Sequence, residues 1–362
     1  MTTLPQRISL VSQTVGILRQ EIADGIWRYW LPGERALGDT LQVSRNTLRA
    51  ALVQLKREGL IRSAHGAGTQ ILAGVPSKRP RLKSHDVALL SLDPLEELRP
   101  SQTLWIDEMR SLLSERGCRL RVFHGRRYFR ANPGPELKKL VSRNPHGCWV
   151  LNLSNRNVQA WFAKSGLPCI VAGSIYPGIE LPFRDLDHRA MCRHAAGVLL
   201  GQGHRRIALI THKSPRAGDV ESAEGLEEGV AKSSHRDAQV VTCFHDSTTG
   251  SICQMVRRLV EQKQRPTALV VVNPFWYLTV SSKLAQLGVR IPEDMSVISR
   301  DEDLFLSFLV PTPARYVVSP HAMARTLLRP VLELLEGDVV TKRALRIMPE
   351  FIRGKSIAVP AA

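Results

Sequence analysis

Several residues suited to polar recognition stand together at the start of one predicted helix of this 362-residue chain. Ser44 is a favoured helix N-cap, and the turn that follows carries Arg45, Asn46, Thr47 and Arg49. Guanidinium and amide groups form hydrogen bonds with base edges and with phosphates. Because a helix that reads the major groove makes its base contacts from its N-terminal residues, this spacing predicts contact with DNA.

Two other predicted helices must position this one. Residues 9–24 have apolar residues at helical spacing and stop at Gly25. A Pro-Gly turn then leads into a short helix that begins at Glu34 and contains Arg35. The third helix, residues 45–59, has one apolar stripe made of Leu48, Ala51, Leu52 and Leu55. The stripe predicts a buried face and leaves the polar residues of the first turn on the other face.

A Gly-rich hairpin follows the third helix. Residues 60–64 and 69–72 are predicted to be strands, and His65 and Gly66 lie in the tip between them. Since glycine allows backbone to approach a neighbour closely, we expect this tip to reach a phosphate or the minor groove.

These short motifs occur in the order and spacing of a known DNA-binding module. They are Leu31-Pro-Gly-Glu-Arg-Ala-Leu, Val43-Ser-Arg-Asn-Thr-Leu-Arg-Ala-Ala-Leu, Glu58-Gly-Leu-Ile and Gly66-Ala-Gly-Thr. Together they resemble the winged helix-turn-helix of GntR-type regulators. The resemblance implies that Arg35, Arg45, Arg49, His65 and Gly66 contact DNA, with Thr47 supporting a phosphate or base contact.

The charge balance also favours a polyanionic partner. The chain has 50 Lys and Arg against 33 Asp and Glu, a net charge of +17. Residues 1–85 carry 13 basic against 5 acidic residues, so the surplus is concentrated at this end. Charge alone is equally compatible with a ribosomal protein, a membrane-surface protein or a generally basic proteome. The motifs described above indicate that the polyanionic partner is DNA.

Composition and hydrophobic pattern divide the sequence into three parts. We predict a DNA-binding domain over residues 1–75, a basic, Pro-broken linker over residues 76–85, and an effector-binding and dimerisation domain over residues 86–362. In the last part short apolar runs alternate with helical segments, which is typical of parallel sheets covered by helices. We therefore expect an α/β fold: a winged helix-turn-helix joined to a two-lobed, periplasmic-binding-protein-like domain.

Other classes of protein are not indicated. The longest apolar runs are far shorter than the roughly 20 residues of a membrane span, and no secretory signal is recognisable. We expect a cytoplasmic protein. The six cysteines stand singly, without metal-ligand spacing. No Gly-x-Ser-x-Gly, Walker or Gly-x-Gly-x-x-Gly motif occurs, so neither an enzyme, a metal nor a cofactor is expected.

The later part resembles the effector-binding domain of LacI-type regulators. The motifs are Gly203-His-Arg-Arg-Ile-Ala-Leu-Ile, Glu224-Gly-Leu and Pro292-Glu-Asp-Met-Ser-Val-Ile, followed by Asp301. The resemblance implies a homodimer, a double-stranded DNA operator and a small-molecule effector, a sugar or a sugar acid, bound between two lobes. Effector-induced closure of the lobes is expected to relieve repression.

Effector contacts are expected after the carboxyl ends of the strands, because open parallel sheets bind ligands there. The candidates at strand ends are Asp93, His124, Asn152–Asn155, His212, Asn273, Trp276, Arg300 and Asp301, and Ser222 is a further candidate. A carboxylate accepts hydroxyl hydrogen bonds, and an indole stacks on the apolar face of a sugar.

Three positions depart from the LacI-type pattern. Ser222 stands where an arginine is usual, Pro274 where an acidic residue is usual, and Arg300 where an aromatic residue is usual. A common hexose is thereby disfavoured. Arg300 indicates either an acidic ligand or a surface salt bridge with Glu302. The departures also leave open a DNA-binding protein whose C-terminal domain dimerises but has lost its effector.

Overall fold

The chain is described by a computed structural model that covers residues 10–23, 27, 30–64, 68–72, 86–213 and 216–360. It divides into two compact units, Met1–Arg79 and Pro80–Ala362, and each is described here by itself. The expected tip residues His65 and Gly66 and the expected linker lie outside the described residues. No helix among the described residues is long and apolar enough to span a membrane.

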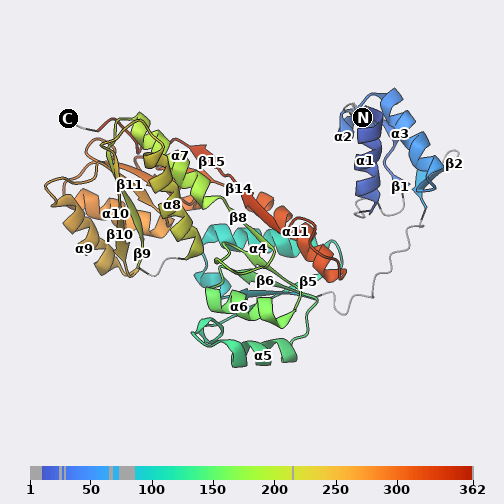
Figure 1. Ribbon diagram of the computed structural model, residues 1–362, viewed down its shortest axis with the longest axis horizontal. Coiled ribbons are helices and arrows are strands. Elements are labelled where there is room, and N and C mark those ends of the chain that lie inside the picture. Colours follow the sequence, from blue (N-terminus) through green and yellow to red (C-terminus); the bar gives the residue numbers. More distant parts are fainter. Residues whose placement is uncertain are drawn as a thin grey trace, which may run out of the picture. The chain divides into compact units, whose positions relative to one another are not determined.

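The first unit is a three-helix head with a small antiparallel sheet (Figure 1). Its elements are α1 (Leu10–Ala23), β1 (Trp30–Leu31), α2 (Glu34–Leu41), α3 (Arg45–Arg57), β2 (Ile61–Ala64) and β3 (Gly68–Ile71). The predicted stripe of α3 is the core of the head, since Leu48, Ala51 and Leu55 are fully buried against α1 and α2. The hairpin β2–β3 has β1 as an additional strand on the β3 side, which the sequence did not indicate.

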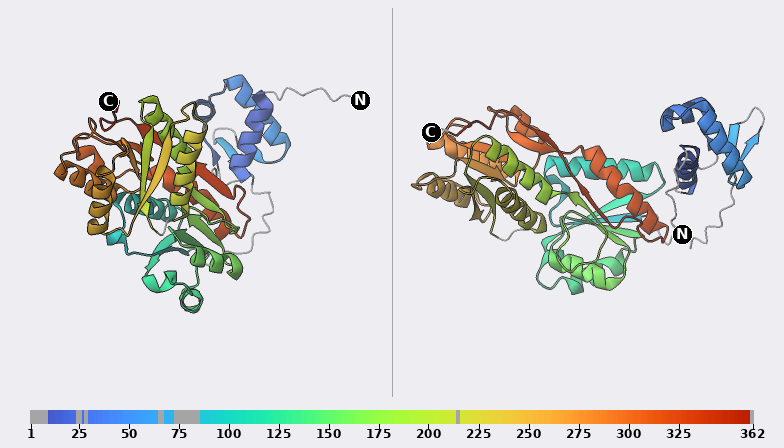
Figure 2. Two further views of the ribbon diagram at one scale, coloured as in Figure 1. Left: turned by 60° about the vertical axis from the view of Figure 1, so that its left-hand side comes forward. Right: turned by 45° about the horizontal axis from the view of Figure 1, so that its top comes forward.

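The second unit has two α/β lobes (Figures 1 and 2). Lobe 1 contains β4 (Asp86–Ser91), η1 (Leu95–Glu97), α4 (Pro100–Ser114), β5 (Arg119–His124), η2 (Arg126–Phe129), α5 (Gly134–Arg143), β6 (Cys148–Asn152), α6 (Arg156–Ser165), β7 (Cys169–Ala172), β8 (Phe183–Leu186), α11 (Pro320–Leu335) and β14 (Ala344–Ile347). Its strand order is β14-β8-β7-β6-β4-β5. Helices α4 and α11 pack on one face of this sheet, and α5 and α6 pack on the other.

Lobe 2 repeats this layering. It contains α7 (His188–Gly201), β9 (Arg206–His212), α8 (Ala217–Ala231), β10 (Gln239–His245), α9 (Thr249–Val260), β11 (Ala268–Val271), α10 (Pro274–Gln286), β12 (Ser296–Ser299), η3 (Leu304–Phe308), β13 (Ala314–Val317) and β15 (Glu350–Ile352). The strand order is β10-β9-β11-β12-β13-β15, and only the pair β13–β15 among these described strands is antiparallel. Helices α7 and α8 cover one face, and α9 and α10 cover the other.

The chain crosses between the lobes at three places, after β8, after β13 and after β14. The second of these crossings places α11 and β14 in lobe 1 although they follow most of lobe 2 in sequence. Close packing of α7 on α8 fixes the start of lobe 2. A Cβ on Gly225 of α8 would lie 2.2 Å from the carbonyl oxygen of Arg189 on α7, so only glycine fits there.

Candidate functional site

The start of α3 is built as the sequence predicts. The Ser44 hydroxyl accepts a hydrogen bond from the Thr47 amide at 3.2 Å and lies 2.8 Å from the Thr47 hydroxyl. This cap satisfies an amide that would otherwise lack a partner in the first helical turn. Because the apolar stripe of α3 is buried, Arg45, Asn46 and Arg49 are exposed.

Two ion pairs fix the neighbours of this helix. Arg49 Nε donates to Glu34 Oε2 of α2 at 2.8 Å, and both side chains are largely solvent-accessible. Arg19 of α1 forms a two-pronged bond with Glu58, directly after α3. Arg35 is exposed on α2. The described part of the head therefore presents Arg35, Arg45 and Arg49 to solvent around the start of α3.

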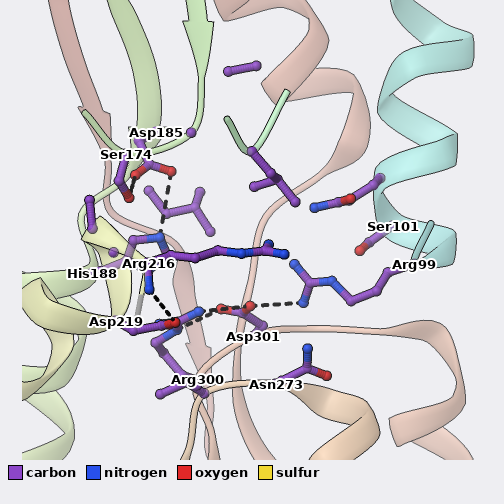
Figure 3. A pocket seen from close by; sticks show the side chains of 18 of the residues that line it. Arg99, Ser101, Ser174, Asp185, His188, Arg216, Asp219, Asn273, Arg300 and Asp301 are labelled. Atoms are coloured by element: carbon purple, nitrogen blue, oxygen red, sulfur yellow. Dashed lines mark hydrogen bonds and ion pairs between the residues drawn. The ribbon is translucent and has the colours of Figure 1, made fainter. Parts of the chain in front are cut away.

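The second unit contains a cavity of about 380 Å³ between its two lobes. Residues of lobe 1 that line it lie at the starts of α4 and α11 and at the ends of β6, β7 and β8. Those of lobe 2 lie at or after the ends of β9, β10, β11, β12 and β13. The polar and aromatic lining includes Arg99, Ser101, Trp105, Asn152, Ser174, Tyr176, Asp185, His188, His212, Arg216, Asp219, Asn273, Trp276, Arg300 and Asp301. Figure 3 shows ten of these side chains around the opening.

A network of alternating charges forms the floor of the cavity. Arg300 Nη1 donates to Asp219 Oδ1 at 2.7 Å and to the Ser222 hydroxyl at 3.0 Å. Arg300 Nε and Nη2 donate to the two carboxylate oxygens of Asp301 at 2.9 and 3.1 Å. Arg99, from lobe 1, donates to Asp301 Oδ2 at 2.8 Å, so this bond joins the lobes (Figure 3).

Burial alone would work against every charge in this network. Burial opposes the positive charge of Arg300, but the carboxylates of Asp301 and Asp219 raise the pKa of Arg300 above its usual value. Burial likewise would raise the pKa of Asp301, and the charges of Arg300 and Arg99 instead hold it below its usual range. Arg300 and Asp301 therefore keep one another ionised.

Arg300 does not pair with Glu302, so the expectation of a surface salt bridge between them is wrong. Arg300 is buried and its partners are Asp219 and Asp301, while Glu302 pairs with Arg315 at 2.5 Å. The reason is geometric. Arg300 follows β12 directly and turns inward to the start of α8, whereas Glu302 lies beside β13.

Five of the expected effector residues line the cavity, together with Asn152 and Ser154 of the expected loop after β6. The five are His212, Asn273, Trp276, Arg300 and Asp301. Ser222 lies behind the cavity wall and contacts Arg300. Asp93 and His124 are not among the lining residues. His124 ends β5, the outermost strand of the lobe 1 sheet, whereas the lining residues follow β6, β7 and β8.

The sequence did not indicate Arg99, Asp185, His188, Arg216 or Asp219 as cavity residues. The Ser174 hydroxyl donates to Asp185, and His188 Nε2 lies 3.6 Å from Asp185 Oδ1. Asp219 and Ser222 are three residues apart and face the same side of α8, so the position of Ser222 carried a signal for Asp219. No local pattern in the sequence indicated the other four residues, Arg99, Asp185, His188 and Arg216.

A histidine pair borders the cavity on lobe 2. The rings of His245 and Trp276 meet edge to face with centroids 4.3 Å apart. The ring centroid of His212 lies 6.3 Å from that of His245. His245 Nδ1 accepts a hydrogen bond from the Ser247 amide, and its Nε2 is buried without a partner among the described residues. Burial, and then the charge of His212, lowers the pKa of His245 to about 4.

This lowered pKa predicts acid sensitivity. The unfolded chain binds the proton near the usual histidine pKa of about 6.5, before the folded chain does. The contribution of His245 to stability is therefore complete above that pH and is lost as the pH falls toward 4. At about 1.4 kcal/mol per pKa unit, this contribution amounts to about 3 kcal/mol. We expect His245→Asn to flatten the fall of unfolding free energy measured by urea denaturation between pH 6.5 and 4. His124→Asn is the control, and an unchanged slope in His245→Asn would contradict the prediction.

Two family matches cover separate parts of the chain. Residues 10–71 match the bacterial regulatory proteins of the gntR family, and residues 196–357 match the periplasmic binding protein-like domain.

Curated relatives with these parts are regulators. The transcriptional regulator KdgR of Bacillus subtilis is 24% identical over 61% of this chain and 66% of its own length. The arabinose metabolism transcriptional repressor of Halalkalibacterium halodurans is 24% identical over 76% of this chain and 74% of its own length. The repressor PurR of Aliivibrio fischeri is 28% identical over 44% of this chain. This chain thus spans about two thirds of KdgR and about half, 48%, of PurR.

Solved structures share the fold. The CelR–cellobiose complex, a transcriptional regulator, covers 97% of this chain and 100% of its own, with a TM-score of 0.65 and 20% identity. A LacI family regulator from Bifidobacterium animalis covers 77% of this chain and 99% of its own, with a TM-score of 0.66 and 20% identity. The chain therefore carries a gntR-family domain and a periplasmic binding protein-like domain, and it is similar to bacterial transcriptional regulators that bind DNA.

Proposed function

We propose that this regulator binds an operator through the start of α3 and represses transcription until a sugar or sugar acid enters the cavity between its lobes. The observation that carries the proposal is the cavity itself, because both lobes supply polar side chains to a space of about 380 Å³. That volume is in the range of small-molecule sites. The proposal involves binding only, with no catalytic step.

The lining suits a polyhydroxylated ligand. Asn152 and Asn273 each offer both a donor and an acceptor, and the carboxylates offer acceptors. Trp276 and Trp105 provide the flat apolar surfaces on which sugar rings stack. That CelR was solved with cellobiose supports a sugar-derived effector here as well.

Arg216 favours an acidic member of this class. Its side chain reaches into the cavity opposite Arg99 (Figure 3), and it forms no ion pair with any described residue. Arg300 is already neutralised by two carboxylates and cannot serve this purpose. A ligand carboxylate would give Arg216 the opposite charge that it lacks.

The same geometry suggests how an effector would change the angle between the lobes. The Arg99–Asp301 bond and a bond from Arg346 on β14 to Glu221 on α8, at 2.6 and 2.7 Å, both connect lobe 1 with lobe 2. A ligand that contacts Arg99 or Asp301 changes these bonds and therefore the preferred angle between the lobes. Large apolar side chains at η3 and beyond, Leu304, Phe308 and Val310, are 60%, 84% and 98% exposed. They support a homodimer, which would place two heads on a pseudo-palindromic operator.

A thermal-shift panel tests the effector class. Neutral hexoses and pentoses are compared with the matching aldonic and uronic acids, using wild type, Arg216→Gln and the exposed control Arg236→Gln. At 100 times its Kd a ligand adds about 2.7 kcal/mol to the stability of the folded state. We expect an acid to raise the Tm of wild type and of Arg236→Gln by several degrees, and Arg216→Gln to lose this preference. An acid preference that survives in Arg216→Gln would remove Arg216 from the site.

A second candidate function is a DNA-binding protein that dimerises without an effector. The observation in its favour is that Asp219, Asp301 and Arg300 already satisfy one another. No Tm change with any compound of the panel would favour this second function.

A further inference from the structure

Lobe 1 contains a second cavity that is separate from the one between the lobes. Its volume is about 230 Å³, and it lies beside α11, whose position next to α4 is visible in Figure 1. Its lining is mainly basic and comes from β8, α11 and the segment that leads to β14. The lining residues are Arg184, Arg325, Thr326, Arg329, Pro330, Glu333, Thr341, Lys342 and Leu345.

Arg184 is the central feature of this cavity because it is a buried cation with no paired carboxylate. Its residue is 4% exposed. Nε donates to the Thr326 carbonyl at 3.1 Å, and Nη1 donates to the carbonyls of Phe183 and Arg343 at 2.7 and 3.3 Å. Within the described part of the chain, Nη2 has no acceptor. Burial lowers the pKa of Arg184 below its usual value, and the nearby charge of Glu333 only partly opposes this shift.

The other charges of the lining do not supply the missing partner. Glu333 is the one acidic lining residue, and its oxygens already accept hydrogen bonds from Arg329 Nε at 3.2 Å and from the amide and hydroxyl of Thr341 at 3.1 and 3.0 Å. Arg325 and Lys342 form no ion pair with a described residue. Arg329 thus engages the one carboxylate of the lining, and Arg184, Arg325 and Lys342 have no carboxylate partner among the described residues.

We propose that this cavity is a binding site for a phosphate-bearing small molecule. Phosphate offers oxygen acceptors on several sides, which suits arginine donors that converge from a strand and a helix. A buried guanidinium without a counter-charge destabilises the fold, and a bound dianion would remove that cost. The volume exceeds that of a bare phosphate ion, so the cavity has room for the molecule that carries it.

The position of this site ties it to the cavity between the lobes. Arg184 and Asp185 are neighbours on β8, and consecutive strand residues point to opposite faces, so Asp185 lines one cavity and Arg184 the other. Along α11, Pro320 and Met323 line the first cavity, and Arg325 and Arg329 line the second. A ligand at the second site therefore acts on the same strand and helix as the effector, which is the arrangement required for coupled binding.

Calorimetric titration of the full chain tests the proposal. The probes are inorganic phosphate and glucose 6-phosphate, with glucose and sodium chloride as controls, all at one ionic strength. The proteins are wild type, Arg325→Gln/Arg329→Gln, Lys342→Gln, Arg216→Gln and the matched control Arg257→Gln/Arg258→Gln on α9, with circular dichroism to verify folding.

We expect saturable binding of both phosphates to wild type, weakened at least tenfold in Arg325→Gln/Arg329→Gln and weakened also in Lys342→Gln. The α9 control should bind as wild type does. Equal binding by all five proteins, or no saturable binding to wild type, would overturn the proposal. A loss confined to Arg216→Gln would also overturn it, because the phosphate would then occupy the cavity between the lobes. The thermal-shift panel tests the effector independently of this titration. A negative titration therefore leaves the proposal of an effector between the lobes intact.

Discussion

Replacing Arg300 with methionine is expected to lower the free energy of unfolding by about 3–5 kcal/mol, the usual effect of removing one partner from a buried ion pair. Methionine matches the aliphatic part of arginine but lacks the guanidinium, so Asp219 and Asp301 would remain buried without the cation that neutralises them. Asp301 would keep its bond to Arg99, while Asp219 would lose its ion-pair partner among the described residues. Urea denaturation at pH 7 measures the loss.

Arg290→Met is the matched control for this measurement. Arg290 also forms a two-pronged bond with an aspartate, Asp294, at 2.9 and 3.1 Å, but its side chain is 70% exposed. An exposed pair contributes roughly 0–1 kcal/mol, so this variant should stay close to wild type. If Arg300→Met lost no more stability than Arg290→Met, the charge network would not be a stabilising part of the fold.

The network also explains how the sequence departs from the LacI-type pattern. Ser222 replaces the usual arginine on α8, and Arg300 replaces the usual aromatic residue after β12. In the fold Arg300 donates to the Ser222 hydroxyl at 3.0 Å. A guanidinium therefore still lies beside this position of α8, but it extends from the end of a neighbouring strand. Taken one at a time, the two positions indicate that an arginine and an aromatic residue are missing. In the structure, the two substitutions together move one guanidinium from α8 to the end of β12.

Features that depend on neighbours in sequence could be predicted. The N-cap Ser44, the stripe of α3 and the central strands of both lobes follow from local spacing and composition. The alternation of strands and helices likewise predicted two layered α/β lobes. The cap, the stripe and each single strand are local patterns, and the alternation only repeats such patterns along the chain, so no knowledge of tertiary contacts was needed.

Features that depend on distant contacts could not be predicted. Arg99 and Asp301 are bonded although they are 202 positions apart. The short strands β8, β14 and β15 have three or four residues each, too few to show a period, and without them the crossings between the lobes and the place of Asp185 are hidden. His124 was expected at the site because it ends a strand, but its strand is at the sheet edge, and strand order cannot be derived from local pattern.

The second large effect is expected at the DNA-binding head. The double variant Arg45→Ala/Arg49→Ala should weaken operator binding by about 2–5 kcal/mol, since each arginine at a base edge contributes roughly 1–3 kcal/mol. Both side chains are exposed at the capped start of α3. Operator fragments selected from a random duplex pool, titrated by fluorescence anisotropy at fixed salt, provide the measurement.

Lys56→Ala/Arg57→Ala is the control because it removes the same two charges from the other end of the same helix. Both variants lose two positive charges and so the same general attraction to phosphate. Any difference between their affinities for DNA therefore comes from where the charges lie on α3. The control should lose affinity equally for operator and random duplex, whereas Arg45→Ala/Arg49→Ala should lose mainly the preference for operator. Equal losses in the two variants would mean that the start of α3 does not read base edges. In wild type, Arg49 must break or weaken its ion pair with Glu34 to reach a base. Part of the free energy of DNA binding is therefore used to offset the loss of that ion pair. Because this pair is exposed and contributes little by itself, the preference for operator should survive that cost.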